Sequence, residues 1–373
     1  MDILNSTVTD LQKVKFFFDD SEDLSGLKDL KTSQFKKIFI ICDESLKNNW
    51  LKKIKKHISK KNTYYFFLPG NEEIKSLNKA ECLINFFESK KCSKSDLIIS
   101  IGGGTILDLS AFVASIYMRG INLMMVPTTL MGQADACSGG KTCINSSQSK
   151  NLIGTLYMPK YVYNNINIIE TSSEFSLRQG ISEIFKYGLL GSPKLLKMLK
   201  EYSIDFDKKK LIPILKETIK VRIKLRKKNP LISNLGHTFG HAFESESKNK
   251  VAHGDAIAVG IAISLKLSLE KKIISKKLYL EIFKLMKDLN LNLKIDKSVK
   301  VEALIRHMLK DKKSNGKQIG FVLLKKIGET KKSKNSDFFY IEPIRVKKFL
   351  LKVFKHDDLL YKNHWKNLTV NKL

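Results

Sequence analysis

The order in which strand-like and helix-like segments follow one another is the feature that most limits how this chain can fold. Short apolar runs predict buried strands at 37–42, 63–68, 96–101 and 123–126. Apolar residues at helical spacing separate them, as at 74–90 and 108–117. Strands that alternate with helices are typical of an open, mostly parallel α/β sheet. From about residue 173 the pattern becomes almost entirely helical, with one more strand expected at 319–324.

A chain of 373 residues is long enough for two domains, and the change in pattern suggests where they meet. We predict an α/β domain over residues 1–165 and a mainly helical domain over residues 166–373. The polar and aromatic stretch after about Lys355 receives no assignment.

The chain is strongly basic, with 67 Lys and Arg against 37 Asp and Glu and a net charge of +30. Such a charge can indicate a nucleic-acid or acidic-membrane partner. Here the lysines are scattered along the whole chain, as at 53–61 and 208–210. We therefore expect solvated lysine-rich faces and no nucleic-acid partner, with a positive field that attracts a phosphorylated substrate.

Cysteine usage and apolar runs bear on the cellular compartment. The five cysteines are odd in number and show no ligand spacing, which favours reduced thiols in the cytoplasm. The first residues lack the basic-then-apolar pattern of a secretion signal. Apolar runs stay below the ~18 residues that a membrane span needs. We expect a cytoplasmic protein with no membrane partner.

A glycine loop follows one of the predicted strands. Gly102, Gly103, Gly104 and Thr105 join the strand at 96–101 to the next helix. Glycines let backbone N–H groups approach a phosphate, and a helix N-terminus favours negative charge. The loop therefore favours dinucleotide or phosphate binding over a plain tight turn, although it is not the ordinary GxGxxG fingerprint.

Three of the seven histidines gather in the helical part of the chain. His237 and His241 are four residues apart and so share one helix face, and His253 precedes the next expected helix. Converging imidazoles, together with a carboxylate, are what a zinc ion binds. The alternative is a set of satisfied core histidines. The spacing alone does not decide which of the three bind a metal.

A further group of charged residues stands in an uncharged setting, unlike the lysine runs elsewhere. Arg119, Asp135, Lys141 and the pair Lys150-Asn151 lie among Gly, Thr, Ser and apolar side chains. This setting favours ligands for phosphate and hydroxyl groups. The alternative is ordinary surface charge on loops.

These segments together resemble the 3-dehydroquinate synthase family, the sugar phosphate cyclases, over about residues 37–350. The resemblance is dense at 102–159, which begins GGGTILDLSAF, and continues at 178–188 (RQGISEIFKYG), 234–241 (NLGHTFGH), 253–260 (HGDAIAVG) and 311–324 (DKKSNGKQIGFVLL). It implies a Rossmann-like NAD-binding domain followed by a helical metal and substrate domain.

The resemblance also implies roles for single residues. Metal ligands would be Glu183, His237 and His253, binding zinc, for which cobalt could substitute. NAD contacts would come from Asp43, Glu72, Lys75, Gly103, Gly104, Thr105, Asp108, Thr128, Thr129, Lys141, Lys150 and Thr171. The catalytic and substrate set would be His241, Lys186, Asp135, Lys141, Asn151, Asn234, Arg119 and Lys312. Arg119 would reach the phosphate from the partner subunit, which implies a homodimer.

The reaction that the family carries out explains these residue types. NAD oxidises a secondary alcohol, phosphate leaves by β-elimination, the ketone is reduced again, and an aldol step closes the carbocycle. There is no net redox change. Zinc polarises the alcohol, and cations hold the phosphate and favour its departure. The substrate phosphate can itself take the proton.

One position departs from the family's pattern. Members of the dehydroquinate type carry an Arg seven residues before the first histidine, which grips the substrate carboxylate with an earlier Lys. Here that position is Pro230, which has neither a charge nor an N–H, and the earlier Lys position falls on Arg222. Two explanations remain. Nearby cations could bind the carboxylate instead, namely Arg222, Lys224, Arg226, Lys227 and Lys228. Alternatively, the substrate has no carboxylate.

We expect a 3-dehydroquinate synthase activity on 3-deoxy-arabino-heptulosonate 7-phosphate. The first alternative is a sedoheptulose 7-phosphate cyclase of the 2-epi-5-epi-valiolone type. A metal-dependent polyol dehydrogenase is a further alternative, although a plain alcohol would not need Lys141, Asn151 and Arg119. A non-catalytic binding protein that uses the net charge of +30 is the last.

Overall fold

The computed structural model describes residues 1–9, 12–30, 32–58, 62–147, 150–170, 173–248, 250–295 and 299–356. The chain divides into two compact units. The sheet unit comprises Met1–Tyr187 and Lys197–Lys228, and the helical unit comprises Gly188–Leu196 and Asn229–Leu373. The expected boundary between residues 165 and 166 marks a change in secondary structure, and it stays a prediction as a domain limit.

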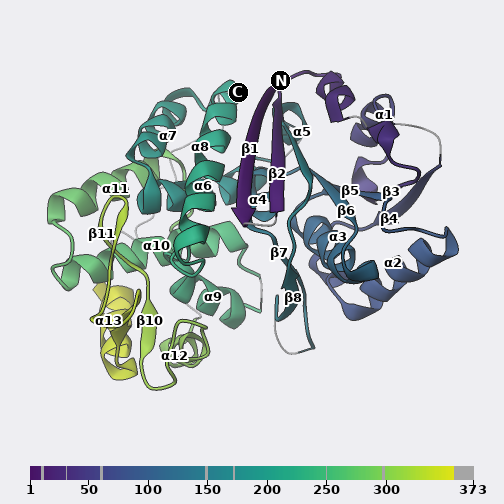
Figure 1. The fold of residues 1–373 in the computed structure, drawn as a ribbon. Coiled ribbons are helices and arrows are strands. Elements are labelled where there is room, and N and C mark those ends of the chain that lie inside the picture. The colour runs from purple at the N-terminus through teal and green to yellow at the C-terminus, as the bar shows by residue number, and fades with distance from the viewer. Residues whose placement is uncertain are drawn as a thin grey trace. The chain divides into compact units, whose positions relative to one another are not determined.

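A seven-stranded sheet forms the centre of the sheet unit (Figure 1). Its strands, in spatial order, are β1 (Asp2–Thr9), β2 (Gln12–Asp19), β9 (Tyr161–Asn165), β6 (Asn122–Pro127), β5 (Leu97–Gly102), β3 (Ile38–Asp43) and β4 (Thr63–Leu68). All neighbours pair in parallel except β1 and β2, which form an antiparallel hairpin. The predicted α/β fold with a mostly parallel sheet is confirmed.

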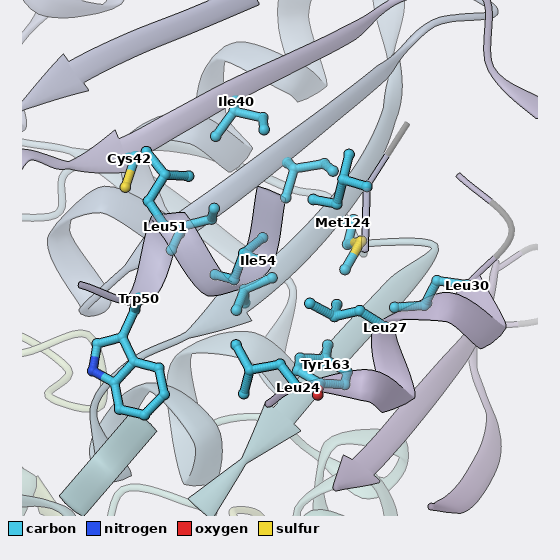
Figure 2. Packing of buried hydrophobic residues seen from close by; sticks show 14 of the residues in the cluster. Leu24, Leu27, Leu30, Ile40, Cys42, Trp50, Leu51, Ile54, Met124 and Tyr163 are labelled. Atoms are coloured by element: carbon cyan, nitrogen blue, oxygen red, sulfur yellow. The ribbon is translucent and has the colours of Figure 1, made fainter. Parts of the chain in front are cut away.

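The central strands are apolar because both of their faces are covered. Every residue of β5 is buried, as expected for a strand inside a parallel sheet. On one face of β3, Phe39 packs edge-on against Phe87 of α2 (Leu77–Ser89), with ring centroids 5.2 Å apart. On the other face lies a cluster built from a short 3-10 helix, η1 (Ser25–Leu30), and from α1 (Trp50–Lys55). Figure 2 shows its members Leu24, Leu27, Leu30, Ile40, Cys42, Trp50, Leu51, Ile54, Met124 and Tyr163.

The remaining elements of the sheet unit are helices and one small hairpin. The helices are α3 (Gly104–Ile116), α4 (Cys137–Gly139), α5 (Ile166–Glu170) and α8 (Leu211–Lys228). The hairpin pairs β7 (Lys141–Ile144) with β8 (Ile153–Leu156). Two of the limits between the two units fall within α6 (Glu174–Gly191) and α7 (Pro193–Asp205), and the third follows the last residue of α8.

Helices dominate the helical unit, as the sequence predicts. They are α9 (His237–Glu246), α10 (His253–Glu270), α11 (Lys276–Asp288), α12 (Val301–Leu309) and α13 (Pro343–His356). Two short antiparallel pairs accompany them: β10 (Ile319–Phe321) with β13 (Phe339–Ile341), and β11 (Leu323–Lys326) with β12 (Glu329–Lys331). The strand expected at 319–324 is therefore present as β10 and the start of β11. Among the described residues, the helices include none with both the length and the apolar character to cross a bilayer.

Candidate active site

The carboxyl ends of three parallel strands bring several predicted cofactor residues to one edge of the sheet. β3 ends at Asp43, β5 ends at Gly102, and Thr128 directly follows β6. From β3 the chain adds β4 on one side and β5 on the other, so the strand order reverses there. Ligands of open α/β sheets bind at such a switch point, outside the carboxyl ends of the strands. The fold therefore supplies a cofactor edge.

The glycine loop leaves room at this edge. A Cβ atom added to Gly104, the first residue of α3, would meet no atom within 4 Å, whereas one on Gly103 would lie 3.3 Å from Thr129 Cγ2. The loop is tied to the next strand end, since the backbone N–H of Thr128 donates to the Gly102 carbonyl at 3.0 Å. The open N-terminus of α3 can therefore accept an anionic group such as a pyrophosphate.

A buried lysine organises the neighbouring part of the edge. Lys75 is 4% exposed and donates to Asp108 Oδ2 at 2.7 Å and to the side-chain oxygen of Asn151. Burial raises the pKa of Asp108. Burial alone would lower the pKa of Lys75. The nearby Asp108, Cys143 and Glu72 outweigh this effect, and the pKa of Lys75 is raised. Residues predicted for NAD and for the substrate thus meet at one ion pair.

Two residues in this cluster were missed by the sequence analysis. Cys143 Sγ lies 3.6 Å from Lys75 Nζ, and Asn145 Nδ2 donates to Glu72 Oε1 at 2.9 Å. Beside them lies a cavity of about 620 Å³, within the size range of ligand pockets, lined by Glu72, Glu73, Lys75, Ser76, Leu77, Asn145, Ser146, Ser147 and Ile153. The only signal in the sequence was their place on the segment that carries Lys141 and Asn151.

Two further predicted cofactor residues are anchored locally. Asp43 accepts from the backbone N–H and the hydroxyl of Ser45 at 3.0 and 2.7 Å, and a Cβ atom on Gly70 would meet its other carboxylate oxygen. Thr105 Oγ1 lies 3.4 Å from the Gly70 carbonyl oxygen, to which it donates. Lys150 is exposed, and Thr171 lies outside the described residues.

A second ion pair in the sheet unit, between the buried Arg222 and the half-buried Asp135, holds the Asp135 carboxylate. Arg222 Nε lies 3.0 Å from Asp135 Oδ1 and 2.8 Å from the Tyr187 hydroxyl oxygen, and Arg222 Nη1 donates to Ser138 Oγ at 2.7 Å. Tyr187 donates to the same Asp135 oxygen at 2.5 Å. Burial opposes ionisation of Asp135, but Arg222 outweighs it and lowers the pKa of this carboxyl. Tyr187 and Ser138 were missed, because nothing local in the sequence joins them to Asp135.

Two predicted catalytic lysines stand near this pair. Lys141 keeps solvent access at the start of β7, yet loss of hydration and the nearby Arg222 lower its pKa. Lys186 is buried in α6 and donates to Glu183 Oε2. Burial alone would lower the pKa of Lys186. The Glu183 carboxylate outweighs this effect, and the pKa of Lys186 is raised.

In the helical unit, α9 and α10 cross with their backbones in contact. Gly236 precedes α9 with a φ of +80°, and a Cβ atom on Gly260 of α10 would lie 2.1 Å from the Gly236 carbonyl oxygen. Gly240 is equally constrained, since its Cβ would lie 3.0 Å from the Ala256 carbonyl oxygen. Only glycine permits this approach. It brings the first turns of both helices, and hence their histidines, together.

The three histidines do meet, but they are held differently. The ring centroids of His237 and His253 are 5.7 Å apart, and His241 lies 5.1 Å from His237. His237 Nδ1 lies 3.2 Å from the Leu235 carbonyl oxygen, and His253 Nδ1 lies 3.2 Å from both carboxylate oxygens of Glu244. Carbonyl and carboxylate oxygens accept, so each Nδ1 carries a proton, and Nε2 is the ring nitrogen through which such a histidine can bind a metal.

His241 differs from the other two. Its Nδ1 is 4.0 Å from Asp311 Oδ2, too far for a hydrogen bond, and its side chain is 49% exposed. Loss of hydration lowers its pKa to about 4, so it is neutral at neutral pH. Within this unit, ligand atoms of His241, Glu244 and His253 also lie within 4.8 Å of one another, which is a further possible metal group.

The remaining predicted residues sit on loops. Arg119 is exposed, and it follows Met118 in a left-handed turn with φ values of 60° and 47°. Such conformations are strained for non-glycine residues and are frequent at functional sites. Asn234 accepts at its backbone carbonyl from the N–H of His237 at 3.1 Å, at the start of α9. Lys312 is exposed, whereas the next residue, Lys313, is buried and lies 2.6 Å from Asp311.

Comparison with known proteins gives these sites a context. The model of the 3-dehydroquinate synthase N-terminal domain matches residues 65–179, and that of the C-terminal domain matches residues 180–314. A curated relative, the 3-dehydroquinate synthase of Clostridium tetani, is 34% identical over 328 residues, which cover 84% of this chain and 87% of the relative.

Solved structures share the fold. A 2-deoxy-scyllo-inosose synthase in complex with carbaglucose-6-phosphate, NAD+ and Co2+ has a TM-score of 0.82 and 21% identity, covering 95% of this chain and 99% of that one. A 2-epi-5-epi-valiolone synthase from Streptomyces hygroscopicus, with bound NAD+ and Zn2+, has a TM-score of 0.79 and 18% identity, covering 93% and 99%. From the curated relative and the two family models, this chain belongs to the 3-dehydroquinate synthase family.

Proposed function

We propose that this protein is a 3-dehydroquinate synthase, which converts 3-deoxy-arabino-heptulosonate 7-phosphate into 3-dehydroquinate and phosphate with no net redox change. The observation that carries the proposal is the 34% identity to the Clostridium tetani 3-dehydroquinate synthase over 87% of that enzyme. Such an enzyme is a carbon–oxygen lyase of the shikimate pathway. We propose a cytoplasmic location and a homodimer, with the phosphorylated sugar acid as its substrate.

NAD is the cofactor that the carboxyl edge of the sheet fits. The open N-terminus of α3 suits the pyrophosphate. Asp43 ends β3, and Glu72 and Lys75 belong to a short 3-10 turn after β4. When bound, NAD would take up a hydride from the substrate and return it later. The sheet edge itself would hold the dinucleotide, while the Lys75–Asp108 pair would keep the Asn151 side chain in place beside it.

A divalent metal is the second cofactor that we propose, with Glu183, His237 and His253 as its ligands. The donor chemistry fits zinc or cobalt, because two imidazoles and a carboxylate are ligands that these ions prefer, and both imidazoles engage an acceptor through Nδ1. When bound, the cation would polarise the substrate hydroxyl and ease its deprotonation. His241, neutral and lacking a hydrogen bond from Nδ1 to Asp311, would then be left for the substrate.

The basic residues would hold the phosphate and the hydroxyls. We propose that Lys141 and Asn151 bind the phosphate, joined by Arg119 of the partner subunit. Asp135 and Lys186 would face the hydroxyl groups, held by Arg222 and Glu183 respectively. Fixed cations aimed at a leaving phosphate stabilise the charge that develops as it departs. Asn234 and Lys312 complete the proposed substrate set.

Pro230 keeps a second substrate in consideration. Of the nearby cations, Arg222 is buried and engaged with Asp135, Tyr187 and Ser138, so it is poorly placed to grip a carboxylate. Arg226 remains, with Met158 Sδ at 3.6 Å from its Nη1, as do the exposed Lys224, Lys227 and Lys228. The alternative is a sedoheptulose 7-phosphate cyclase, whose substrate lacks a carboxylate.

The test is a phosphate-release assay with NAD and zinc, run in parallel on 3-deoxy-arabino-heptulosonate 7-phosphate and sedoheptulose 7-phosphate. We expect stoichiometric phosphate from the first compound and no accumulation of NADH. Turnover of the second compound alone would replace the proposed substrate. Steady NADH production without phosphate release would instead identify a polyol dehydrogenase.

A further inference from the structure

The contact between His253 and Glu244 is a polar pair that the cyclase reaction does not account for. Glu244 lies on α9 and His253 opens α10, and the pair joins the two helices at their crossing. Both carboxylate oxygens of Glu244 lie 3.2 Å from His253 Nδ1. The Glu244 side chain is 13% exposed and that of His253 is 34% exposed, so the contact is largely shielded from water.

A carboxylate on Nδ1 determines the form of the ring. Ionised carboxylates accept hydrogen bonds and cannot donate them, so His253 holds a proton on Nδ1, and Nε2 is the nitrogen through which the ring can bind a cation. His237 reaches the same state by another route, through the Leu235 carbonyl oxygen at 3.2 Å. Two imidazoles of the helical unit are thus set in the same tautomer by two different acceptors.

We propose that Glu244 is a positioning residue, which fixes the tautomer and the ring orientation of His253 so that Nε2 faces a divalent cation. The proposal rests on the metal site of the proposed function. Carboxylates that hold a histidine ligand in this way raise its basicity, and their loss weakens metal binding about 10- to 100-fold. Glu244 would act through His253 and would not touch the metal.

The competing role for Glu244 is that of a direct ligand, together with His241 and His253. The contact geometry argues against it. A cation on His253 Nε2 lies on the side of the ring away from Nδ1, and Glu244 engages Nδ1 with both of its oxygens. A carboxylate that binds Nδ1 in this way is turned from the cation that Nε2 would hold.

The experiment compares Glu244→Gln with Glu246→Gln. Glu246 is on the same helix and also faces a histidine, with its Oε2 3.5 Å from His307 Nε2, so it is a matched control. Metal-free protein would be titrated with Co2+, and the dissociation constant and visible spectrum recorded. We expect Glu244→Gln to bind one Co2+ about 10- to 100-fold more weakly than wild type. Glu246→Gln should match wild type.

Either of two results would overturn the proposal. Unchanged Co2+ affinity in Glu244→Gln would show that the carboxylate does not support His253, and complete loss of binding, as in His253→Ala, would make Glu244 a ligand. Nitrogen chemical shifts of the His253 ring in metal-free protein give a second readout, which should show Nδ1–H in wild type and a mixture of tautomers in the variant. The same ring readout on Glu244→Asp decides the matter if Glu244→Gln does not fold.

The ring readout also separates this proposal from the proposed function. If wild type bound no divalent metal, the cyclase proposal would fail, whereas the tautomer of His253 would still report on Glu244. If wild type bound metal and Glu244→Gln bound it equally well, only the role of Glu244 would fail.

Discussion

The sheet unit and the helical unit build their polar sites in opposite ways. In the sheet unit, charged side chains far apart in the sequence meet as ion pairs of a buried cation with a partly buried carboxylate, Lys75 with Asp108 and Arg222 with Asp135. In the helical unit, imidazoles meet at one helix crossing, and His237 and His253 are each held at Nδ1 by an acceptor. The first arrangement fixes charges in place, and the second leaves donor atoms available for a cation. Removing one residue should therefore affect metal binding in the helical unit and the stability of the fold in the sheet unit.

Removing a metal donor from the helical unit should have the largest effect on function. His253→Ala removes one proposed ligand, so we expect loss of stoichiometric zinc and of phosphate release, with the helices retained. Metal analysis by mass spectrometry and circular dichroism would check this. His307→Ala, which removes the histidine facing Glu246, serves as the control. Wild-type zinc content in His253→Ala would contradict the ligand set.

In the sheet unit, breaking the Arg222–Asp135 pair should cost stability. Arg222 is 8% exposed and the Asp135 side chain is 30% exposed, so Arg222→Ala leaves a partly buried carboxylate without its guanidinium partner. We expect the free energy of unfolding to fall by about 1–3 kcal/mol, measured by urea denaturation. Lys210→Ala, which breaks an exposed pair with Asp205, should cost less than about 1 kcal/mol. Equal costs would remove the contrast between buried and exposed pairs.

Lys141 tests whether a single exposed cation of the sheet unit acts in catalysis. Because it keeps solvent access, Lys141→Ala should leave stability near wild type, and as one of many predicted NAD contacts it should weaken NAD binding less than it slows catalysis. We expect phosphate release to slow by about 10²–10³-fold, the usual cost of losing one group that stabilises developing charge. Steady-state kinetics and NAD titration would separate the two properties. An unchanged rate would place the phosphate site elsewhere.

Lowering the pH should have the smallest of these effects, a change in the stability that the Arg222–Asp135 pair contributes. The pKa of Asp135 is lowered in the folded protein, with Arg222 as the cause that overcomes burial. A depressed carboxyl pKa stabilises the fold above the unfolded value, about 3.9, and this contribution is lost as the pH falls through the folded value. The stability difference between wild type and Arg222→Ala should therefore be constant near neutral pH and shrink below about pH 4. Urea melts over this range would show a constant difference if Asp135 were not involved.

The sequence predicted best those features that are local in the chain. The parallel strands at 38–43 and 97–102, the glycine loop and the histidine cluster each depend on neighbouring residues, and all are present. The sequence analysis did not predict the hairpin β1–β2 or strand β9. The sequence of β1 is largely polar, without regular alternation of apolar and polar residues, and β9 is rich in Tyr and Asn.

Features that depend on topology could not be predicted in the same way. Tyr187 joins Asp135 only because α6, α8 and the π-helical turn Gly132–Ala136 meet, and the sequence separates these residues widely. The sequence also could not predict which of two adjacent lysines is buried. The turn at 311–314 directs Lys313 inward and Lys312 outward. The assignment of His237 and His253, as against His241, gained its physical argument only from the acceptors at Nδ1.

The crossing of α9 and α10 has a consequence for how this protein can change over time. At Gly236 and Gly260 the place of each missing side chain is taken by the backbone of the other helix, so neither position can gain even a methyl group by itself. Enlarging both at once would separate the helices further still. The distance between the two imidazoles is thus set by contact between main chains. Substitutions elsewhere in the helical unit can change the stability of the unit while this distance stays the same.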